Sequence, residues 1–389
     1  MNTSSFNRSN VLPFSNPFEK VTSPIVEIAV ISIYRNSLNS FLEKNRDLIN
    51  RYSSGIIKLF QLFIESCADY KIYADYSISC LDKVSYESDK EKIQAFANIA
   101  CYLSVNGFSS KWSIKGIHLD SSYFDNFILD NIEITEIEND PIKYEINFTT
   151  TTGIIDVHYH NPMRINQRGE LLNVQKTEIG NIAVFPVQIA PKIWRNRILG
   201  DSASNANDTF YSKVNLALEL LRDFASPYLD WVDKITNKII VFDSDSDSHI
   251  KSGSWEEAMS LYNLSVNHDV YIIAELLVHE SSHQYFNLLK KIDDFAKPHE
   301  SLYYSAAVDK DRPLWAILIA YHAFANIVLF YRMLIENKAD WKEIIVEREK
   351  ENMLLVNSLA THLVNNKYLT DTGKTLFLSL HERITNKSE

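Results

Sequence analysis

The chain shows two hydrophobic periods, and the change between them divides it into three stretches. At 25–64 and 89–103, apolar residues recur at the three- and four-residue spacing of helices. In the middle of the chain, residues alternate at every second position, most clearly at 132–137 and 144–148, which is typical of half-buried strands. From about Val214 the helical spacing returns. The pattern predicts an α+β fold with a β-rich middle region and a helix-rich C-terminal half.

Three segments of the C-terminal half have sequence patterns that predict their secondary structure. Short apolar runs at 238–242 and 261–266 predict strands, and the second comes shortly before a predicted helix. Pro313 stands at the start of a long apolar segment, where proline suits the first turn of a helix. This segment, 314–330, contains a histidine and an asparagine and has charged flanks. We therefore expect a buried core helix there, not a membrane span.

The changes in hydrophobic period and in composition along the chain predict three regions. Residues 1–16 are rich in Ser and Asn, which predicts a flexible N-terminus. Residues 17–213 form a helical and then β-rich region, for which we hypothesise a role in docking a peptide. Residues 214–389 form the region that carries the candidate metal-binding and catalytic residues. Within it, Ser252-Gly253-Ser254 is expected to form a turn.

The candidate chemistry is centred on one predicted helix, 274–286, which contains the pattern His-Glu-x-x-His. His279 and His283 are four residues apart, so both imidazoles lie on one helix face and can reach one metal ion. Glu280 is about 100° around the helix from His279, so it can meet a metal-bound water without being a ligand. Apolar neighbours predict burial, and buried histidines need partners. The pattern favours a zincin-like metal helix over an amphipathic helix with two surface histidines.

A catalytic metal needs a third protein ligand and an open position. We prefer His322, because an unpartnered imidazole inside an apolar helix would be costly. The alternative for His322 is a core histidine hydrogen-bonded to a carbonyl. Glu300 is a second candidate ligand, although it lies in an expected loop. The pair His158 and His160 shares one face of an expected strand but has no carboxylate at a suitable spacing, so we expect it to be structural.

Arg312 directly precedes the segment that carries His322, so we expect it near the metal. A guanidinium group can bind a carboxylate through two parallel hydrogen bonds. The alternative is a surface salt bridge with Asp309 or Asp311.

The composition of the chain bears on its binding partners and on its cellular location. The formal net charge is -11, which argues against a nucleic-acid partner because phosphate neutralisation needs clustered Lys and Arg. The three cysteines, Cys67, Cys80 and Cys101, are too few and odd in number for a disulfide framework. The first residues lack the apolar run of a signal peptide. We therefore expect a cytoplasmic protein that has no membrane partner.

Short motifs follow one another from about Val214 onward. They are Ser252-Gly253-Ser254, His279-Glu280-Ser281-Ser282-His283, Tyr303-Tyr304-Ser305, Asp311-Arg312-Pro313-Leu314, Tyr321-His322-Ala323-Phe324-Ala325 and Leu369-Thr370-Asp371-Thr372-Gly373. In the order and spacing of these motifs the chain resembles the bacterial family of HExxH motif-containing peptide modification proteins, found beside genes for ribosomally made, modified peptides. After the Tyr-Tyr-Ser motif the family often has Pro-Trp-Arg, where this chain has Ala306-Ala307-Val308.

The resemblance implies an iron(II)- and 2-oxoglutarate-dependent oxygenase that β-hydroxylates a residue of a ribosomally made precursor peptide. It implies that His279 and His283 bind Fe(II), that Arg312 pairs with the distal carboxylate of 2-oxoglutarate, and that O2 is the oxidant. Three protein ligands leave room for the keto acid and oxygen, and Glu280 then orients a ligand or the substrate. Two alternatives are a Zn(II)-dependent metallopeptidase with Glu280 as general base, and a peptide-binding scaffold without catalysis.

Overall fold

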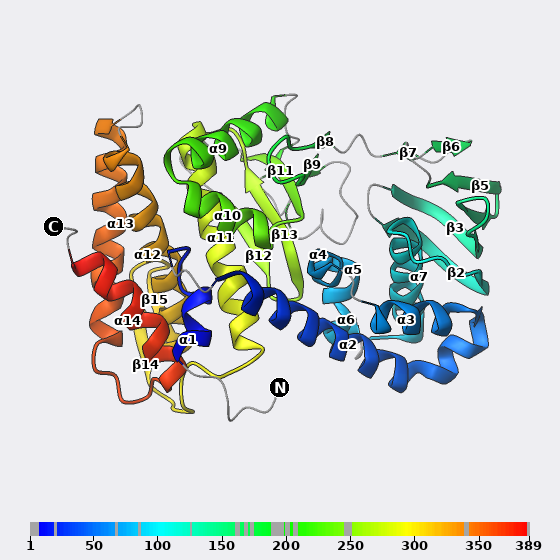
Figure 1. The fold of residues 1–389 in the computed structure, drawn as a ribbon, viewed down its shortest axis with the longest axis horizontal. Helices are drawn as coiled ribbons and strands as arrows, with labels where there is room; N and C mark the ends of the chain where they lie inside the picture. The colour runs from blue at the N-terminus through cyan, green and yellow to red at the C-terminus, as the bar shows by residue number, and fades with distance from the viewer. Residues whose placement is uncertain are drawn as a thin grey trace.

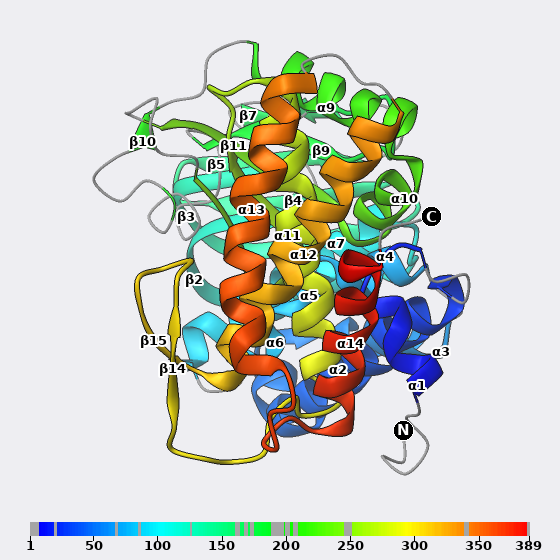
Figure 2. The same ribbon diagram turned by 90° about the vertical axis from the view of Figure 1, so that its left-hand side faces the viewer.

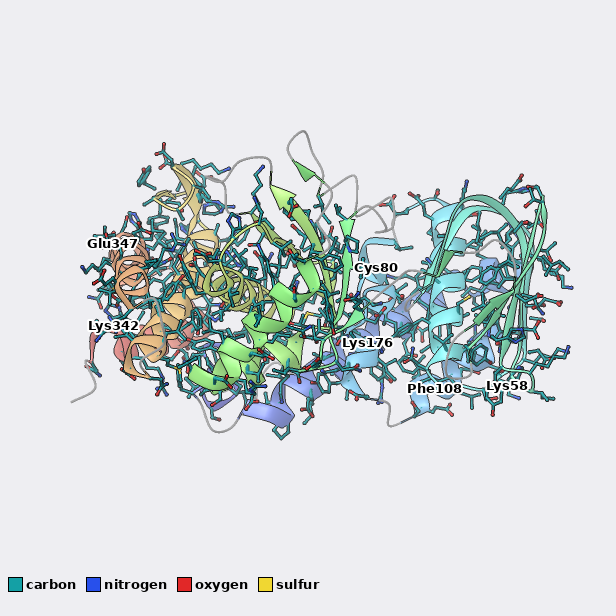
Figure 3. All side chains as sticks on the ribbon, turned by 90° about the horizontal axis from the view of Figure 1, so that it is seen from above. Lys58, Cys80, Phe108, Lys176, Lys342 and Glu347 are labelled. Atoms are coloured by element: carbon teal, nitrogen blue, oxygen red, sulfur yellow. The ribbon has the colours of Figure 1, made fainter. Side chains whose placement is uncertain are left out.

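The chain folds into two lobes of an elongated molecule, and each lobe combines segments of both hydrophobic periods (Figure 1). In this computed structural model each lobe packs helices against a sheet, and helix α2 (Thr22–Tyr52) runs along both. Lys58 and Phe108 lie at one end of the molecule, and Lys342 and Glu347 at the other (Figure 3). The expected α+β class is confirmed. The structure describes residues 8–18, 22–66, 69–84, 87–124, 127–159, 164–166, 170–171, 175–187, 198, 203–204, 209–244, 251–337 and 342–386.

The first lobe is built on an antiparallel sheet that contains the β-rich middle of the chain. Its strands pair in sequence order from β1 to β6, and β7 joins β3. Gly55 connects α2 to α3 with a φ of 81°, and an added Cβ would lie 2.3 Å from the carbonyl oxygen of Lys111, so only glycine fits there. The elements are β1 (Ser53–Ser54), α3 (Ile56–Glu65), α4 (Tyr70–Ala74), α5 (Tyr76–Ser79), α6 (Leu81–Val84), α7 (Asp89–Val105), β2 (Trp112–Phe124), β3 (Phe127–Asp140), β4 (Glu145–Thr150), β5 (Gly153–His158), β6 (Arg164–Asn166) and β7 (Glu170–Leu171).

The second sheet supports the candidate site. Strands β9, β11 and β13 are parallel neighbours, and β12 runs antiparallel to β13. In the described part of the chain β12 forms one edge of this sheet. The strands are β8 (Gln175–Lys176), β9 (Ala183–Pro186), β10 (Ala203–Ser204), β11 (Lys238–Ser244), β12 (Ser252–Trp255) and β13 (Ala258–Ser265).

The sequence predicted the central strands of this sheet but not its edge. The strands expected at 238–242 and 261–266 are confirmed as β11 and β13. The turn expected at Ser252-Gly253-Ser254 is wrong, because these residues form β12 and Ser252 pairs with Leu264 of β13. Since β9 pairs with β11, the sheet joins segments on both sides of the expected boundary at Val214.

Long helices cover the second sheet. Helix α11 (Val270–Lys290) packs against β12, β13 and α12 (Leu314–Glu336), and α12 packs against α13 and α14 (Figure 2). Helix α12 follows Pro313, as expected. It is long and apolar enough to cross a membrane, but 83% of its most apolar stretch is buried inside the protein. The other elements are α9 (Phe210–Phe224), α10 (Ser226–Ile235), β14 (Leu302–Ser305), β15 (Lys310–Pro313), α13 (Lys342–Leu363) and α14 (Asp371–Thr385).

The start of the described chain packs against these helices. Helix α1 (Arg8–Val11) and the 3-10 turn η2 (Leu12–Phe14) are followed by Ser15 and Asn16, and the side chains from Phe14 to Asn16 are fully buried. The Nδ2 of Asn326 on α12 donates a hydrogen bond to the carbonyl oxygen of Ser15. The expectation of a flexible N-terminus over 1–16 is therefore wrong for residues 8–16, and residues 1–7 lie outside the described part.

Candidate metal centre

His279 and His283 converge on one face of α11. Their rings are nearly perpendicular, at 87°, and their Nε2 atoms are 2.9 Å apart. Two nitrogens that each lie about 2.0–2.1 Å from one ion are about 2.8–3.4 Å apart for bond angles from about 90° to 109°. The pair therefore fits a shared metal ion. Burial, followed by the neighbouring His279, lowers the pKa of His283 well below its ordinary value, so this imidazole is neutral at neutral pH, as a metal ligand must be.

Glu280 lies between α11 and the edge of the second sheet. It is 2% exposed, and its Oε1 accepts a hydrogen bond of 2.5 Å from the Oγ of Ser252 on β12. The other carboxylate oxygen, Oε2, is buried and has no hydrogen-bond partner. Because an unpartnered buried carboxylate oxygen is costly, Oε2 is available to a donor that enters the site. The sequence analysis did not identify Ser252 as the partner of Glu280, since that contact depends on the position of β12.

His322 is fully buried in α12, and its contacts are those of a core histidine. Its Nε2 lies 2.9 Å from the carbonyl oxygens of both Phe14 and Ser15, and since carbonyls only accept, Nε2 carries the proton. Nδ1 has no hydrogen-bond partner. Burial lowers the pKa of His322 to about 4, although the carbonyls of Ser15, Phe14 and Ser282 oppose this.

The printed hydrogen bonds of His322 thus go to main-chain carbonyls, but its charge, like that of Arg312, contributes to the lowered pKa of His283, so it lies within electrostatic range of the histidine pair. Among the residues that the structure describes, no group of three or more His, Cys, Asp or Glu side chains is placed to hold a metal ion. His322 as third ligand stays a prediction, and its hydrogen bonds to carbonyls match the alternative stated for it from the sequence.

Arg312 lies on the β14–β15 hairpin, beside α12 (Figure 2). Its direct cross-strand partner is the half-buried Tyr303, and Tyr304 on the opposite face is 48% exposed. Opposite residues of an antiparallel pair share one face, so Arg312 is on the inward face. Its charge contributes to the lowered pKa of His283, which places the guanidinium within electrostatic range of the histidine pair.

The salt bridge considered for Arg312 is not formed. Within the described part of the chain, Arg312 makes no ion pair with Asp309 or Asp311, and Asp309 instead accepts a hydrogen bond from the hydroxyl of Tyr304. A half-buried guanidinium without a carboxylate partner, close to a histidine pair, is suited to bind an anionic ligand.

The remaining sequence candidates lie apart from the pair. Glu300 is exposed in a loop before β14. His158 on β5 lies 3.9 Å from the carboxylate of Glu145, and His160 lies outside the described residues. Cys80 and Cys101 are buried and are not joined to each other by a disulfide. Cys67, like His160, lies outside the described part.

A cavity of about 600 Å³ opens beside His279. One wall is the edge strand β12, including Ser252 and Gly253, and the apolar walls include Trp255 and Phe324. Phe324 also packs edge-on against the ring of His279. The cavity therefore lies between the edge of the sheet and His279.

The sequence analysis missed a buried charged cluster on the wall of this cavity. Glu275, one turn before His279, accepts two hydrogen bonds of 2.8 Å from Nη2 of Arg348 on α13 and a third from the hydroxyl of Tyr331 on α12. Burial acts to lower the pKa of Arg348, but Glu275 raises it. The cluster joins three helices around the site, and no local pattern could reveal it because Glu275 and Arg348 are 73 residues apart.

Comparisons with known proteins add no relative to this description. No protein-family model matches the sequence, and a search of curated proteins gives no significant match.

Proposed function

We propose that this protein is a non-haem iron(II)- and 2-oxoglutarate-dependent oxygenase that β-hydroxylates a residue of a ribosomally made precursor peptide. The observation that carries the proposal is Arg312, a half-buried cation that makes no ion pair within the described part of the chain and whose charge contributes to the lowered pKa of His283. A helix with a pair of metal-binding histidines serves several kinds of reaction. A half-buried guanidinium within electrostatic range of such a pair supports a co-substrate with a carboxylate at its far end. The motif order described above supports the same activity.

In this proposal each site residue has a separate role. His279 and His283 would hold Fe(II), and the bound ion would supply the activation of O2 that side chains cannot supply. Arg312 would bind the distal carboxylate of 2-oxoglutarate through its guanidinium. Glu280 would accept a hydrogen bond at Oε2 from the bound substrate and so orient it. The reaction balances as 2-oxoglutarate, O2 and a C–H bond giving succinate, CO2 and a C–OH bond.

A peptide substrate and a zincin-like arrangement of the site have support of their own. The edge strand β12 lines the cavity beside His279, and an exposed strand edge can pair with an extended peptide. Helix α11 packs against this antiparallel edge and the neighbouring β13. We infer that the cavity takes the segment of the peptide that carries the modified residue, and that the protein works in the cytoplasm, where such precursors are made.

The experiment that tests the proposal is a product assay. Protein purified without oxygen is loaded with Fe(II) and given 2-oxoglutarate and O2, with and without the precursor peptide encoded beside its gene. Succinate together with a gain of about one oxygen atom in the peptide mass is expected. Absence of succinate under these conditions would overturn the proposal.

One observation favours a second candidate function, a zinc-dependent metallopeptidase. Glu280 has a buried and unpartnered oxygen next to the histidine pair, which suits a general base toward water as well as a group that orients substrate. The same assay with Zn(II) in place of Fe(II) separates the two, since a peptidase cleaves the peptide and releases no succinate. Glu280→Ala should abolish cleavage but leave part of an oxygenase activity.

A further inference from the structure

Ser252 joins the edge of the second sheet to α11 through a side-chain hydrogen bond. Its Oγ donates the 2.5 Å hydrogen bond to Oε1 of Glu280, and its own position lines the cavity beside His279. Oε2 of the same carboxylate is buried without a partner. One oxygen of Glu280 is therefore held by the sheet, while the other remains for whatever occupies the site.

We propose that Ser252 is a positioning residue, which holds Oε1 so that Oε2 of Glu280 faces the group bound at His279 and His283. A carboxylate on a three-carbon side chain can turn about its last bonds, and functional groups need supporting hydrogen bonds to hold one orientation. Within the described part, Ser252 is the only side chain that hydrogen-bonds Glu280. The inference rests on the proposed function only in requiring a metal ion at the histidine pair.

Strand β12 is itself held firmly enough to serve as a support. On one side of Ser252, the main chain of Lys251 exchanges hydrogen bonds with Ser265: its N–H donates to Ser265 Oγ at 3.0 Å, and its carbonyl accepts from Ser265 N at 2.8 Å. On the other side, Nδ2 of Asn263 donates to the carbonyl of Gly253 at 2.8 Å. A Cβ at position 253 would lie 2.8 Å from that Nδ2, so the close approach depends on glycine.

The fold also supplies a matched control. The hydroxyl of Tyr262 on β13 lies 3.1 Å from Oγ of Ser281 on α11. This second hydroxyl contact joins the same sheet to the same helix without touching Glu280. Ser281→Ala therefore removes a comparable link between sheet and helix and leaves the carboxylate as it is.

The test uses Co(II) alone as the probe, bound to the full chain, with its affinity and visible absorption spectrum as the readouts. Ser252→Ala and Glu280→Ala should each weaken Co(II) binding about tenfold and change the spectrum in the same way, as loss of a group that supports metal ligands does. The double variant should be no weaker than Glu280→Ala, because the two residues act through one contact. Ser252→Thr, which keeps the hydroxyl, and Ser281→Ala should both resemble the wild type.

Three results would overturn the inference: wild-type behaviour of Ser252→Ala, additive losses in the double variant, or the same loss in Ser281→Ala, which would indicate general loosening of the sheet. A wild-type chain that binds no Co(II) would overturn it as well. The succinate assay tests the proposed function separately. If wild-type protein binds Co(II) but releases no succinate with Fe(II), the oxygenase proposal fails while the spectra still decide the role of Ser252.

Discussion

Acid should destabilise this protein through His322, and the size of the effect follows from its burial. The pKa of His322 is about 4 in the folded protein, against about 6.5 for an unperturbed histidine in the unfolded chain. As the pH falls, the unfolded chain therefore takes up the proton first, and stability that is fully present above about pH 6.5 is lost toward pH 4. Between pH 7.5 and 5.0 this linkage costs about 2 kcal/mol, and below pH 4 about 3 kcal/mol.

The variant that isolates this effect is His322→Gln. A glutamine amide can donate to the carbonyls of Phe14 and Ser15 as Nε2 does now, but it does not take up a proton. Urea unfolding of metal-free protein at pH 7.5 and 5.0 measures the difference in unfolding free energy between the two conditions. The wild type should lose about 2 kcal/mol more than His322→Gln over this interval. His118→Gln is the control, because the side chain of His118 is 76% exposed.

An equal loss of stability in the wild type and in His322→Gln would refute this reasoning, because it would mean that His322 is not held neutral by burial. The same variant also separates the two interpretations of His322. A core histidine can be replaced with little change in metal affinity, whereas a third ligand cannot. From its hydrogen bonds to two carbonyls we expect His322→Gln to retain metal binding and His283→Gln to lose it, as measured by metal titration.

Three further predictions concern Arg312, the cavity wall and the C-terminal helix. Arg312→Ala should raise the KM for 2-oxoglutarate about 30- to 150-fold, since a charged hydrogen-bonded pair contributes about 2–3 kcal/mol. Lys310→Ala, an exposed change on the same strand, should leave the KM unchanged, and equal effects of the two variants would contradict the role of Arg312. Arg348→Met should destabilise the fold by about 2–4 kcal/mol because it leaves Glu275 buried without its cation, and adding Glu275→Gln should restore part of the loss in denaturant unfolding. Gly373→Ala should cost about 1–3 kcal/mol in thermal unfolding, since its Cβ would lie 2.2 Å from the carbonyl oxygen of Phe295; an unchanged Tm would show that the backbone there can move.

Local pattern was enough to predict the elements that carry the site. Helix α11 follows from its apolar sequence, and the convergence of His279 and His283 follows from their four-residue spacing on one face. Strand β13 was likewise visible as a short apolar run. Each of these features depends on residues within a few positions of one another, which is the range over which hydrophobic period and helix geometry carry information.

Features that depend on distant partners were not predictable in this way. Ser252 was expected in a turn because its neighbours are small and polar, but pairing with Leu264 makes it part of a strand. The Nε2 of His322 hydrogen-bonds the carbonyl oxygen of Phe14, which is 308 residues earlier in the chain. An apolar helix with one histidine looks the same in sequence whether that histidine binds a metal or a carbonyl, so only the packing of residues 8–16 distinguishes the two.

The distribution of unpartnered polar atoms offers an argument for a ligand that is independent of any motif. Buried polar groups in folded proteins are nearly always hydrogen-bonded. Among the described residues, α11 nevertheless carries three successive exceptions on its buried side, namely Glu280 Oε2, His283 Nδ1 and Gln284 Oε1. Glu275, on the same helix, is fully satisfied by Arg348 and Tyr331. Within α11, the unpartnered atoms are thus confined to Glu280 and the residues around His283, where a bound metal ion and its ligands would supply missing donors and charge.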